Sequence, residues 1–154
     1  MIRRAELRDI EQIHELLRQV NYVHYIGRPD LFKLGNKYTD EELTAIIQDD
    51  TRPIFVYPDE DDKVIGYVFC IYQQILSSNL LTDIKTLYID DLCVDENKRG
   101  MHIGRQLYEY VLQYARENSF YNVTLNVWAF NENALQFYEK CGLKKQKIYM
   151  EKIL

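Results

Sequence analysis

The middle of the chain contains the pattern that most constrains its fold. Residues Ile84–Val94 form a long run rich in β-branched and aromatic side chains, which predicts a strand. A polar loop containing Gly100 and Gly104 follows, and apolar residues then recur at helical spacing from Ile103 to about Asn118. A strand that passes through a short loop directly into a helix is typical of a mixed α/β domain.

The rest of the chain divides into helical and strand patterns of ordinary length. Apolar spacing predicts helices over 10–22, over the residues that follow Thr39, and over 134–141, where Gly142 is placed as a C-terminal stop. Asp9 with Gln12, and Thr39 with Glu42, resemble capping boxes. Alternation and short apolar runs predict strands at 2–5, 54–57, 64–75, 123–127 and 149–153. Because no linker, repeat or low-complexity segment interrupts these elements, we expect a single domain, 1–154.

The composition of the chain argues against several classes of function. The chain has 24 acidic and 19 basic residues, a net charge of −5, which argues against a nucleic-acid surface. It has no apolar run near the ~20 residues of a membrane helix and no signal-peptide pattern, so we expect no membrane contact and a cytoplasmic location. Cys70, Cys93 and Cys141 are widely spaced without a CxxC pair, which favours reduced thiols and no metal. The acidic run Asp59–Asp62 is expected to be a solvated hairpin loop, with attraction of an amine as the alternative.

The loop between the long strand and its helix is suited to binding phosphate. Gly100 and Gly104 allow the backbone to turn sharply and to approach a ligand closely. The first turn of the following helix has N–H groups without partners and a partial positive charge. Arg99 and Arg105 add cations beside it. The pattern is neither a P-loop nor a GxGxxG fingerprint, and an ordinary tight connection is the alternative.

The run Arg99-Gly-Met-His-Ile-Gly104 resembles motif A of the GNAT superfamily of N-acetyltransferases, whose pattern is Q/R-x-x-G-x-G/A. The resemblance implies the GNAT fold, an α/β fold with a mixed, mostly antiparallel sheet of six to seven strands flanked by about four helices. It also implies that the loop binds the pyrophosphate of acetyl-CoA and that the preceding strand binds the pantetheine arm through its backbone. The implied cofactor-binding residues are Leu92, Cys93, Val94, Arg99, Gly100, Met101, His102, Ile103, Gly104 and Arg105. His102 stands where the family has glycine, which bears on how closely the backbone approaches the ligand.

The stretch Asn131–Leu143 resembles the N-x-x-A-x-x-F-Y-x-x-x-G-F signature of the same family, with Leu143 in place of the usual phenylalanine. The resemblance implies that Asn131 hydrogen-bonds CoA and that Tyr138 is the general acid that protonates the departing CoA thiolate. A phenol holds its proton at neutral pH and is therefore able to donate it. From the residues alone, a helix N-cap for Asn131 and core packing for Tyr138 are the alternatives.

Asp90 and Asp91 are the candidate bases for an acceptor amine, which attacks only in its neutral form. Because they are adjacent on a strand, alternation predicts that only one of them faces the cleft. Asp90 would then share a face with Leu92, and Asp91 would share one with Ile89 and Cys93. The register that matches motif A favours Asp90. Asp91 as base, no carboxylate base, and a structural role for both remain as alternatives.

The expected acceptor is a small-molecule or peptide amine. Tyr22, Tyr25 and Arg28 lie where the first two helices are joined, which is the region expected to select it. No cysteine is placed with a nearby base, so direct transfer in a ternary complex is expected rather than an acyl-enzyme. The sequence thus predicts an N-acetyltransferase with acetyl-CoA as co-substrate and no metal. A homodimer through the edge strand 149–153 is one option. A CoA-binding regulatory or sensor module without transferase activity and a small interaction domain are the alternatives.

Overall fold

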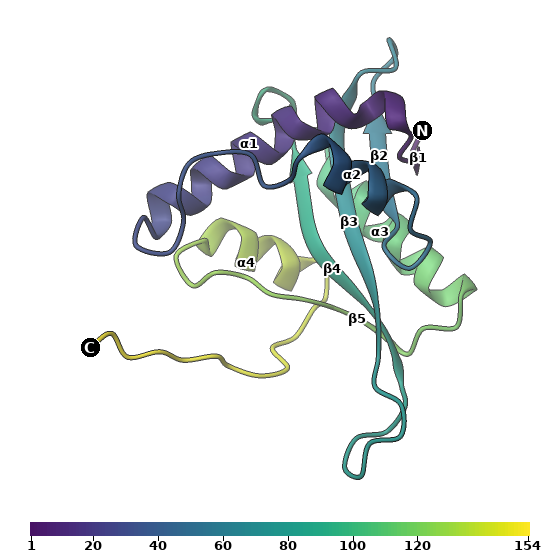
Figure 1. Ribbon diagram of the computed structural model, residues 1–154, viewed down its shortest axis with the longest axis vertical. Coiled ribbons are helices and arrows are strands. Elements are labelled where there is room, and N and C mark those ends of the chain that lie inside the picture. Colours follow the sequence, from purple (N-terminus) through teal and green to yellow (C-terminus); the bar gives the residue numbers. More distant parts are fainter.

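The computed structural model describes all 154 residues and confirms a mixed α/β architecture (Figure 1). Five strands form one sheet in the order β1-β2-β3-β4-β5, in which all neighbours are antiparallel except the parallel pair β4 and β5. The strands are β1 (Arg3–Arg4), β2 (Ile54–Pro58), β3 (Val64–Gln74), β4 (Lys85–Val94) and β5 (Asn122–Leu125). The helices are α1 (Ile10–Gly27), α2 (Asp40–Ile47), α3 (Ile103–Glu117) and α4 (Glu132–Lys140), with 3-10 turns at Leu7–Asp9 and Glu96–Lys98.

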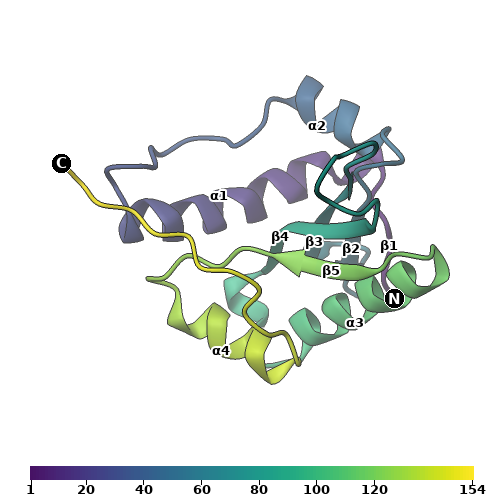
Figure 2. The same ribbon diagram turned by 90° about the horizontal axis from the view of Figure 1, so that it is seen from below.

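The sheet is covered on both faces. Figure 2 shows α1 and α2 on one side and α3 and α4 on the other. A buried cluster that includes Ile13 and Leu43 packs between the sheet and α1 and α2, and a second cluster that includes Leu107 and Val111 packs under α3. β3 is buried from Val64 to Cys70 and contributes side chains to both clusters, because successive residues of a strand point to opposite faces. Its neighbour β4 is therefore held rigidly between two helical layers.

The helix starts agree only in part with the sequence patterns. The capping box at α2 is confirmed, since Thr39 and Glu42 exchange two backbone-to-side-chain hydrogen bonds of 3.1 Å. The box expected from Asp9 and Gln12 is wrong, because Asp9 does not cap α1 with its side chain. Gln12 instead accepts a hydrogen bond of 2.6 Å from the backbone amide of Val64, which ties α1 to β3.

α1 also runs further than expected, to Gly27 rather than to about residue 22. No strong helix breaker occurs before Gly27, and Arg28 is the C-cap. A residue that precedes proline avoids the helical conformation, so Pro29 explains why the helix stops there. The last turns of α1 therefore reach the region in which acceptor-selecting residues were expected.

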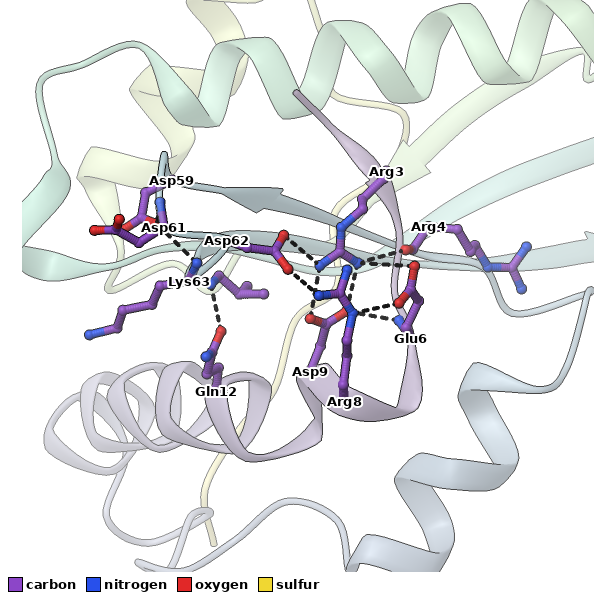
Figure 3. Close-up of polar contacts among 11 residues, drawn as sticks. Arg3, Arg4, Glu6, Arg8, Asp9, Gln12, Asp59, Asp61, Asp62 and Lys63 are labelled. Carbon is purple, nitrogen blue, oxygen red and sulfur yellow. Dashed lines mark hydrogen bonds and ion pairs between the residues drawn. The ribbon is translucent and has the colours of Figure 1, made fainter.

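Charged side chains tie the N-terminal segment to the turn between β2 and β3 (Figure 3). Arg3 donates to both carboxylate oxygens of Asp9, at 2.8 and 3.0 Å, and to Asp62 at 3.3 Å. Arg8 pairs with Asp62 as well. Although burial opposes ionisation of Asp9, the bonds from Arg3 hold the pKa of that carboxyl below its usual value. The run Asp59–Asp62 is confirmed as a hairpin turn, and Asp62 has a structural role in it.

The expected final strand at 149–153 and the count of six to seven strands are wrong. Helix α4 ends as expected at Gly142, which has a φ of 97°. Beyond Leu143 the chain makes no backbone–backbone hydrogen bond, and residues 144–154 are all exposed. A strand needs a neighbour to pair with, and this segment instead runs outward from the fold (Figure 1).

Candidate active site

β4 and β5 separate part-way along their length, and the candidate site lies at this opening. Their parallel pairing ends at Ile89 and Leu125, where β5 stops. β4 continues to Val94 and is paired there only with β3, on its other side. The backbone groups of Leu92 and Cys93 that face the missing neighbour are therefore available to a ligand. This is the strand edge to which the sequence assigned the pantetheine arm.

A β-bulge lies in β4 at the point of separation. In the ladder with β3, Asp91 is opposite Phe69 but Ile89 is opposite Cys70, so Asp90 is an extra residue. Ile89 belongs to the core under α3, whereas both aspartate side chains contact groups on the α1 and α2 side. The expectation that Asp91 shares the face of Ile89 is therefore wrong. Beyond the extra residue, the side chains of β4 that would have pointed to one face of the sheet point to the other.

The two aspartates have different partners. The hydroxyl of Tyr67 donates to Asp91 at 2.6 Å, and the ammonium of Lys37 donates to Asp90 at 3.2 Å. Burial raises the pKa of the Asp91 carboxyl to about 6, while the bond from Tyr67 and the charge of Lys37 oppose the rise. A carboxylate with this pKa is mostly ionised at neutral pH and binds a proton more readily than a surface aspartate. Asp91 thus has the properties of a general base.

The N-terminus of α3 offers amide groups that the protein does not use. His102 is the N-cap of this helix, and its side chain makes no capping hydrogen bond. The first amide with a helical acceptor is that of Gln106, which donates to the His102 carbonyl at 3.0 Å. By contrast, Thr39 caps α2 and Asn131 caps α4, the latter by accepting from the amide of Ala134 at 3.2 Å. The uncapped end of α3 is suited to an anion.

The backbone of this loop has the conformation that its glycine pattern requires. Gly100 has a φ of 85°, and His102 has a φ of 59°, in the left-handed region that glycine adopts most easily. The histidine therefore introduces backbone strain. A Cβ on Gly104 would lie 3.5 Å from Phe137 and 3.6 Å from Val94, so the start of α3 sits close to both α4 and β4.

The side chains around the loop divide into exposed and anchoring groups. Arg99 and Met101 are exposed, whereas Ile103 is buried and anchors the first turn of α3 in the core. Arg105 donates to Glu109 on the next turn at 3.0 Å. Arg99, unlike Arg105, has no ion-pair partner.

Tyr138 lies on α4 and packs toward α3. Its ring packs edge-to-face against Tyr108 of α3, with centroids 6.5 Å apart, and against Phe137. Burial raises the pKa of the Tyr138 phenol above its usual value, and the negative charge of Asp91 raises it further. Tyr138 and Asp91 come from different elements and are near enough for the charge of one to act on the other. The raised pKa keeps the phenol protonated at neutral pH.

The cysteines near the opening are inert. The Cys93 thiol is buried and lies 3.7 Å from the carbonyl of Leu16, and burial raises its pKa. Burial raises the pKa of Cys70 to about 12. A thiol that stays protonated is a poor nucleophile.

The residues expected to select the acceptor are only partly available. Tyr22 and Tyr25 lie on the last turns of α1, where Tyr22 is exposed and Tyr25 is half-buried. Arg28 is engaged, because it donates to both carboxylate oxygens of Asp30, at 2.9 and 2.8 Å, and pairs with Glu151. Arg28 is therefore not free to bind a carboxylate in this arrangement.

Sequence reasoning missed three polar contacts of the site. Lys37 comes from the loop between α1 and α2, which has no periodic pattern, so its contact with Asp90 has no sequence signal. Tyr67 lies directly across the sheet from Cys93, and strand pairing would have been needed to place it beside Asp91. Asn126, just after β5, donates to the hydroxyl of Tyr88 at 3.0 Å.

An aromatic cluster closes the space between the end of α1 and the segment after β5. His24 lies 4.9 Å from Phe32, and Trp128 lies 5.2 Å from Phe32 and 5.9 Å from Phe130, measured between ring centroids. Burial lowers the pKa of His24, and so does the charge of Lys37. Trp128 remains 40% exposed, so one side of this aromatic cluster is open to solvent.

The Acetyltransferase (GNAT) family matches residues 11–143 of the chain. The chain belongs to the GNAT acetyltransferase family. The match includes the loop between β4 and α3, the opening between β4 and β5, and Tyr138. Members of the family are acyltransferases that use acetyl-CoA as co-substrate, so the predicted enzyme class is confirmed.

Relatives along most of the chain are acetyltransferases too. The glucosamine 6-phosphate N-acetyltransferase of Arabidopsis thaliana is 24% identical over 156 residues, which cover 98% of this GNAT chain and 94% of the relative. A peptidyl-lysine N-acetyltransferase of Escherichia coli (strain K12) is 33% identical over 92 residues, 60% of this chain and 50% of the relative. These relatives act on amines of different kinds.

Solved structures agree with the fold. The BH1408 protein of Bacillus halodurans, solved as a tetramutant, is 32% identical with a TM-score of 0.96, over 100% of this chain and 99% of that one. The Arabidopsis enzyme has a TM-score of 0.73 at 25% identity, over 99% and 97% of the two chains. The GNAT fold is therefore present with an open sheet of five strands. None of its helices is both long and apolar enough to cross a bilayer.

Proposed function

We propose that this GNAT protein transfers the acetyl group of acetyl-CoA to a primary amine on a small molecule or peptide, by direct attack in a ternary complex. One observation supports the proposal: β4 loses its neighbour β5 at Ile89, directly before Asp90 and Asp91, and the charge of Asp91 acts on Tyr138 of α4. The arrangement can supply an edge for the donor, a base and an acid. Relatives named for acetylation of an amino sugar and of lysine support an amine acceptor.

The donor is proposed to bind along the loop and the strand edge. The free amides from Ile103 to Arg105 would donate hydrogen bonds to the pyrophosphate, and Arg99 would add positive charge. The backbone of Leu92–Val94 would hydrogen-bond the pantetheine amides as a neighbouring strand would. Asn131 would keep its cap through Oδ1 and use its amide nitrogen to contact CoA.

The chemistry requires two proton transfers. The neutral amine attacks the thioester carbon, the new C–N bond forms, and the C–S bond breaks to release CoA as a thiolate. We assign Tyr138 as the acid that gives its proton to this sulfur, because its raised pKa keeps it protonated at neutral pH. The phenolate then recovers a proton from solvent. No metal takes part in the reaction as proposed.

The proton that leaves the amine needs a base. Asp91, with a carboxyl pKa of about 6, is proposed to accept it through a water molecule. Asp90 is the second candidate, and in this structure it is paired with Lys37. The electrostatics of the structure therefore favour Asp91, whereas the sequence register favoured Asp90.

The test is a thiol-release assay with acetyl-CoA and a panel of polyamines, amino acids, amino sugars, aminoglycosides and peptides. Tyr138→Phe should lower kcat by at least about 10²-fold, as expected for loss of a general acid. Its affinity for CoA, measured by calorimetry, should stay within about twofold. Tyr108→Phe is the matched control, because it removes a neighbouring phenol hydroxyl from a residue outside the proposed chemistry.

The outcomes separate the alternatives. Equal loss in both variants would assign the effect to packing, and full activity in Tyr138→Phe would remove it as the acid. If CoA binds but no amine gives thiol release, the chain is a CoA-binding sensor module instead. We also propose a cytoplasmic location, since Cys70, Cys93 and Cys141 are free thiols, the state that a reducing compartment maintains.

A further inference from the structure

Lys37 is the one lysine of the chain whose ammonium group bonds to a residue of the candidate active site. It donates to Asp90 at 3.2 Å, and no other lysine forms an ion pair. Asp90 is the extra residue of the bulge in β4, directly after the pairing with β5 ends at Ile89. The ammonium group therefore lies at the opening between the two strands, and its side chain remains 40% exposed.

The loop between α1 and α2 is fixed on both sides of Lys37. Before it, Asn21 of α1 donates to the carbonyl groups of Lys33 and Gly35, each at 3.1 Å. After it, the ring of Tyr38 packs against the buried cluster between the sheet and α1 and α2. The backbone that carries Lys37 is thus held beside β4, while its long, flexible side chain can move to reach a neighbouring group.

The acetyl donor, bound as proposed above, would end beside this ammonium group. Its pyrophosphate would lie at the N-terminus of α3, and its pantetheine arm would run back along Leu92–Val94. A strand rises about 3.3 Å per residue, and the next positions along this edge of β4 are Asp91 and Asp90. The thioester would therefore lie near the carboxylate to which Lys37 is bonded.

Lys37 begins from the same protonation state as any other acceptor amine. Although burial opposes ionisation, the charges of Asp90 and Asp91 raise the pKa of Lys37. One proton must leave before the amine can attack, and Asp91 is the base proposed above for every acceptor. Because Lys37 and this base belong to one folded chain, the reaction needs no second acceptor molecule to be captured.

We propose that Lys37 is itself an acceptor, so that the protein acetylates its own Nζ within a single chain. The neutral amine attacks the thioester carbon of acetyl-CoA, a C–N bond forms, and the C–S bond breaks. The proton of the amine passes to Asp91 through water, and the CoA thiolate takes the proton of Tyr138. The products are free CoA and an uncharged acetyl-lysine that no longer pairs with Asp90. This inference rests on the proposed function.

The first test is peptide mass spectrometry after incubation with acetyl-CoA that carries deuterium in its acetyl group, without any other amine. The deuterium separates new acetyl groups from those present at purification. Lys37 should gain the label at least about tenfold faster than Lys33 of the same loop, because only Lys37 is held at the opening. Its rate should saturate with acetyl-CoA and fall when free CoA is added, since the donor must occupy its site.

Variants separate catalysed labelling from chemical acetylation of surface lysines. Lys37→Arg keeps the charge and should carry no label at position 37. Lys33→Arg is the matched control and should leave the labelling rate of Lys37 unchanged. Tyr138→Phe should slow the labelling of Lys37 by at least about 10²-fold, as expected for loss of a general acid.

The second test asks whether transfer stays within one chain. Lys37→Arg retains the acid and the base, and Tyr138→Phe retains Lys37, so the two are mixed and incubated with the labelled donor. Lys37 of the Tyr138→Phe chain should stay as slow to label as it is alone. For the unmodified protein, the first-order rate constant should be the same over about a tenfold range of protein concentration.

The outcomes that overturn the inference differ from those that overturn the proposed function. Equal labelling of Lys37 and Lys33, or labelling of Lys37 that Tyr138→Phe leaves unchanged, is chemical acetylation and removes the inference. Rapid labelling in the mixture removes transfer within one chain. Thiol release with a small amine but no label on Lys37 refutes only this inference. Label on Lys37 without thiol release from any added amine supports it and refutes the proposed small-molecule or peptide acceptor.

Discussion

Replacing Asp91 with asparagine should stabilise the protein at neutral pH while it lowers activity. Burial raises the pKa of this carboxyl from 3.8 to about 6, even though Tyr67 donates a hydrogen bond to it. A difference of about 2 pH units corresponds to about 3 kcal/mol at 1.36 kcal/mol per unit. This is the cost of keeping Asp91 ionised in the folded protein at pH 7. Asparagine has nearly the same shape and can accept the bond from Tyr67 without the charge.

The sign follows from where the proton is bound. Between about pH 4 and 6, the folded protein holds a proton on Asp91 and the unfolded chain does not, so the unmodified protein loses stability as the pH rises. Asp91→Asn lacks this loss. The free energy of unfolding of Asp91→Asn should exceed that of the unmodified protein by almost nothing below about pH 3.8. This difference should grow between pH 4 and 6 and level off at up to about 3 kcal/mol above pH 7. In melting temperature, that limit corresponds to roughly 6–12 °C for a chain of this length.

The assay is urea unfolding of both proteins at several values from pH 3.5 to 8. Asp90→Asn is the matched control, because it removes a partly exposed ion pair with Lys37 and should change the free energy of unfolding by less than about 1 kcal/mol. In the thiol-release assay, Asp91→Asn should lose at least about 10²-fold in kcat. An Asp91→Asn protein that is less stable at pH 7, or whose advantage does not vary with pH, would refute the argument.

Three further predictions follow from the site and the core. Lys37→Met removes a charge that lowers the pKa of Asp91, so the acid limb of the pH–activity profile should move to higher pH. His102→Val should cost about 1–2 kcal/mol in urea unfolding, because a β-branched residue strains the left-handed backbone, whereas His102→Gly should be at least as stable as the unmodified protein. Leu107→Ala should cost about 2–5 kcal/mol by leaving a cavity in the core under α3, measured in the same way, and a smaller loss would mean that the core collapses around it.

Local patterns predicted most of the elements. The long strand that ends at Val94, the helix that follows the glycine loop, and the stop at Gly142 depend on neighbours in the sequence, and the structure confirms them. The two signature stretches likewise pointed to the GNAT family, which the family match confirms. The sequence could not show the bulge at Asp90, because an extra residue is defined only against the pairing strand β3.

Other features depended on contacts between distant segments. Gln12 fits a capping pattern, but its side chain instead accepts a hydrogen bond from the backbone amide of Val64. The pattern at 149–153 predicts a strand, but a strand forms only by pairing, and this segment makes no backbone–backbone hydrogen bond.

The sequence by itself determined most of the helices and strands, the family, and the candidate site residues, because each of these depends on spacing along the chain. Only the tertiary structure decided that Asp90 and Asp91 face the same side, that burial sets them apart chemically, and that Lys37 and Tyr67 are their partners. Burial, charge and hydrogen bonding act through space, and segments far apart in sequence create them only when the fold brings them together.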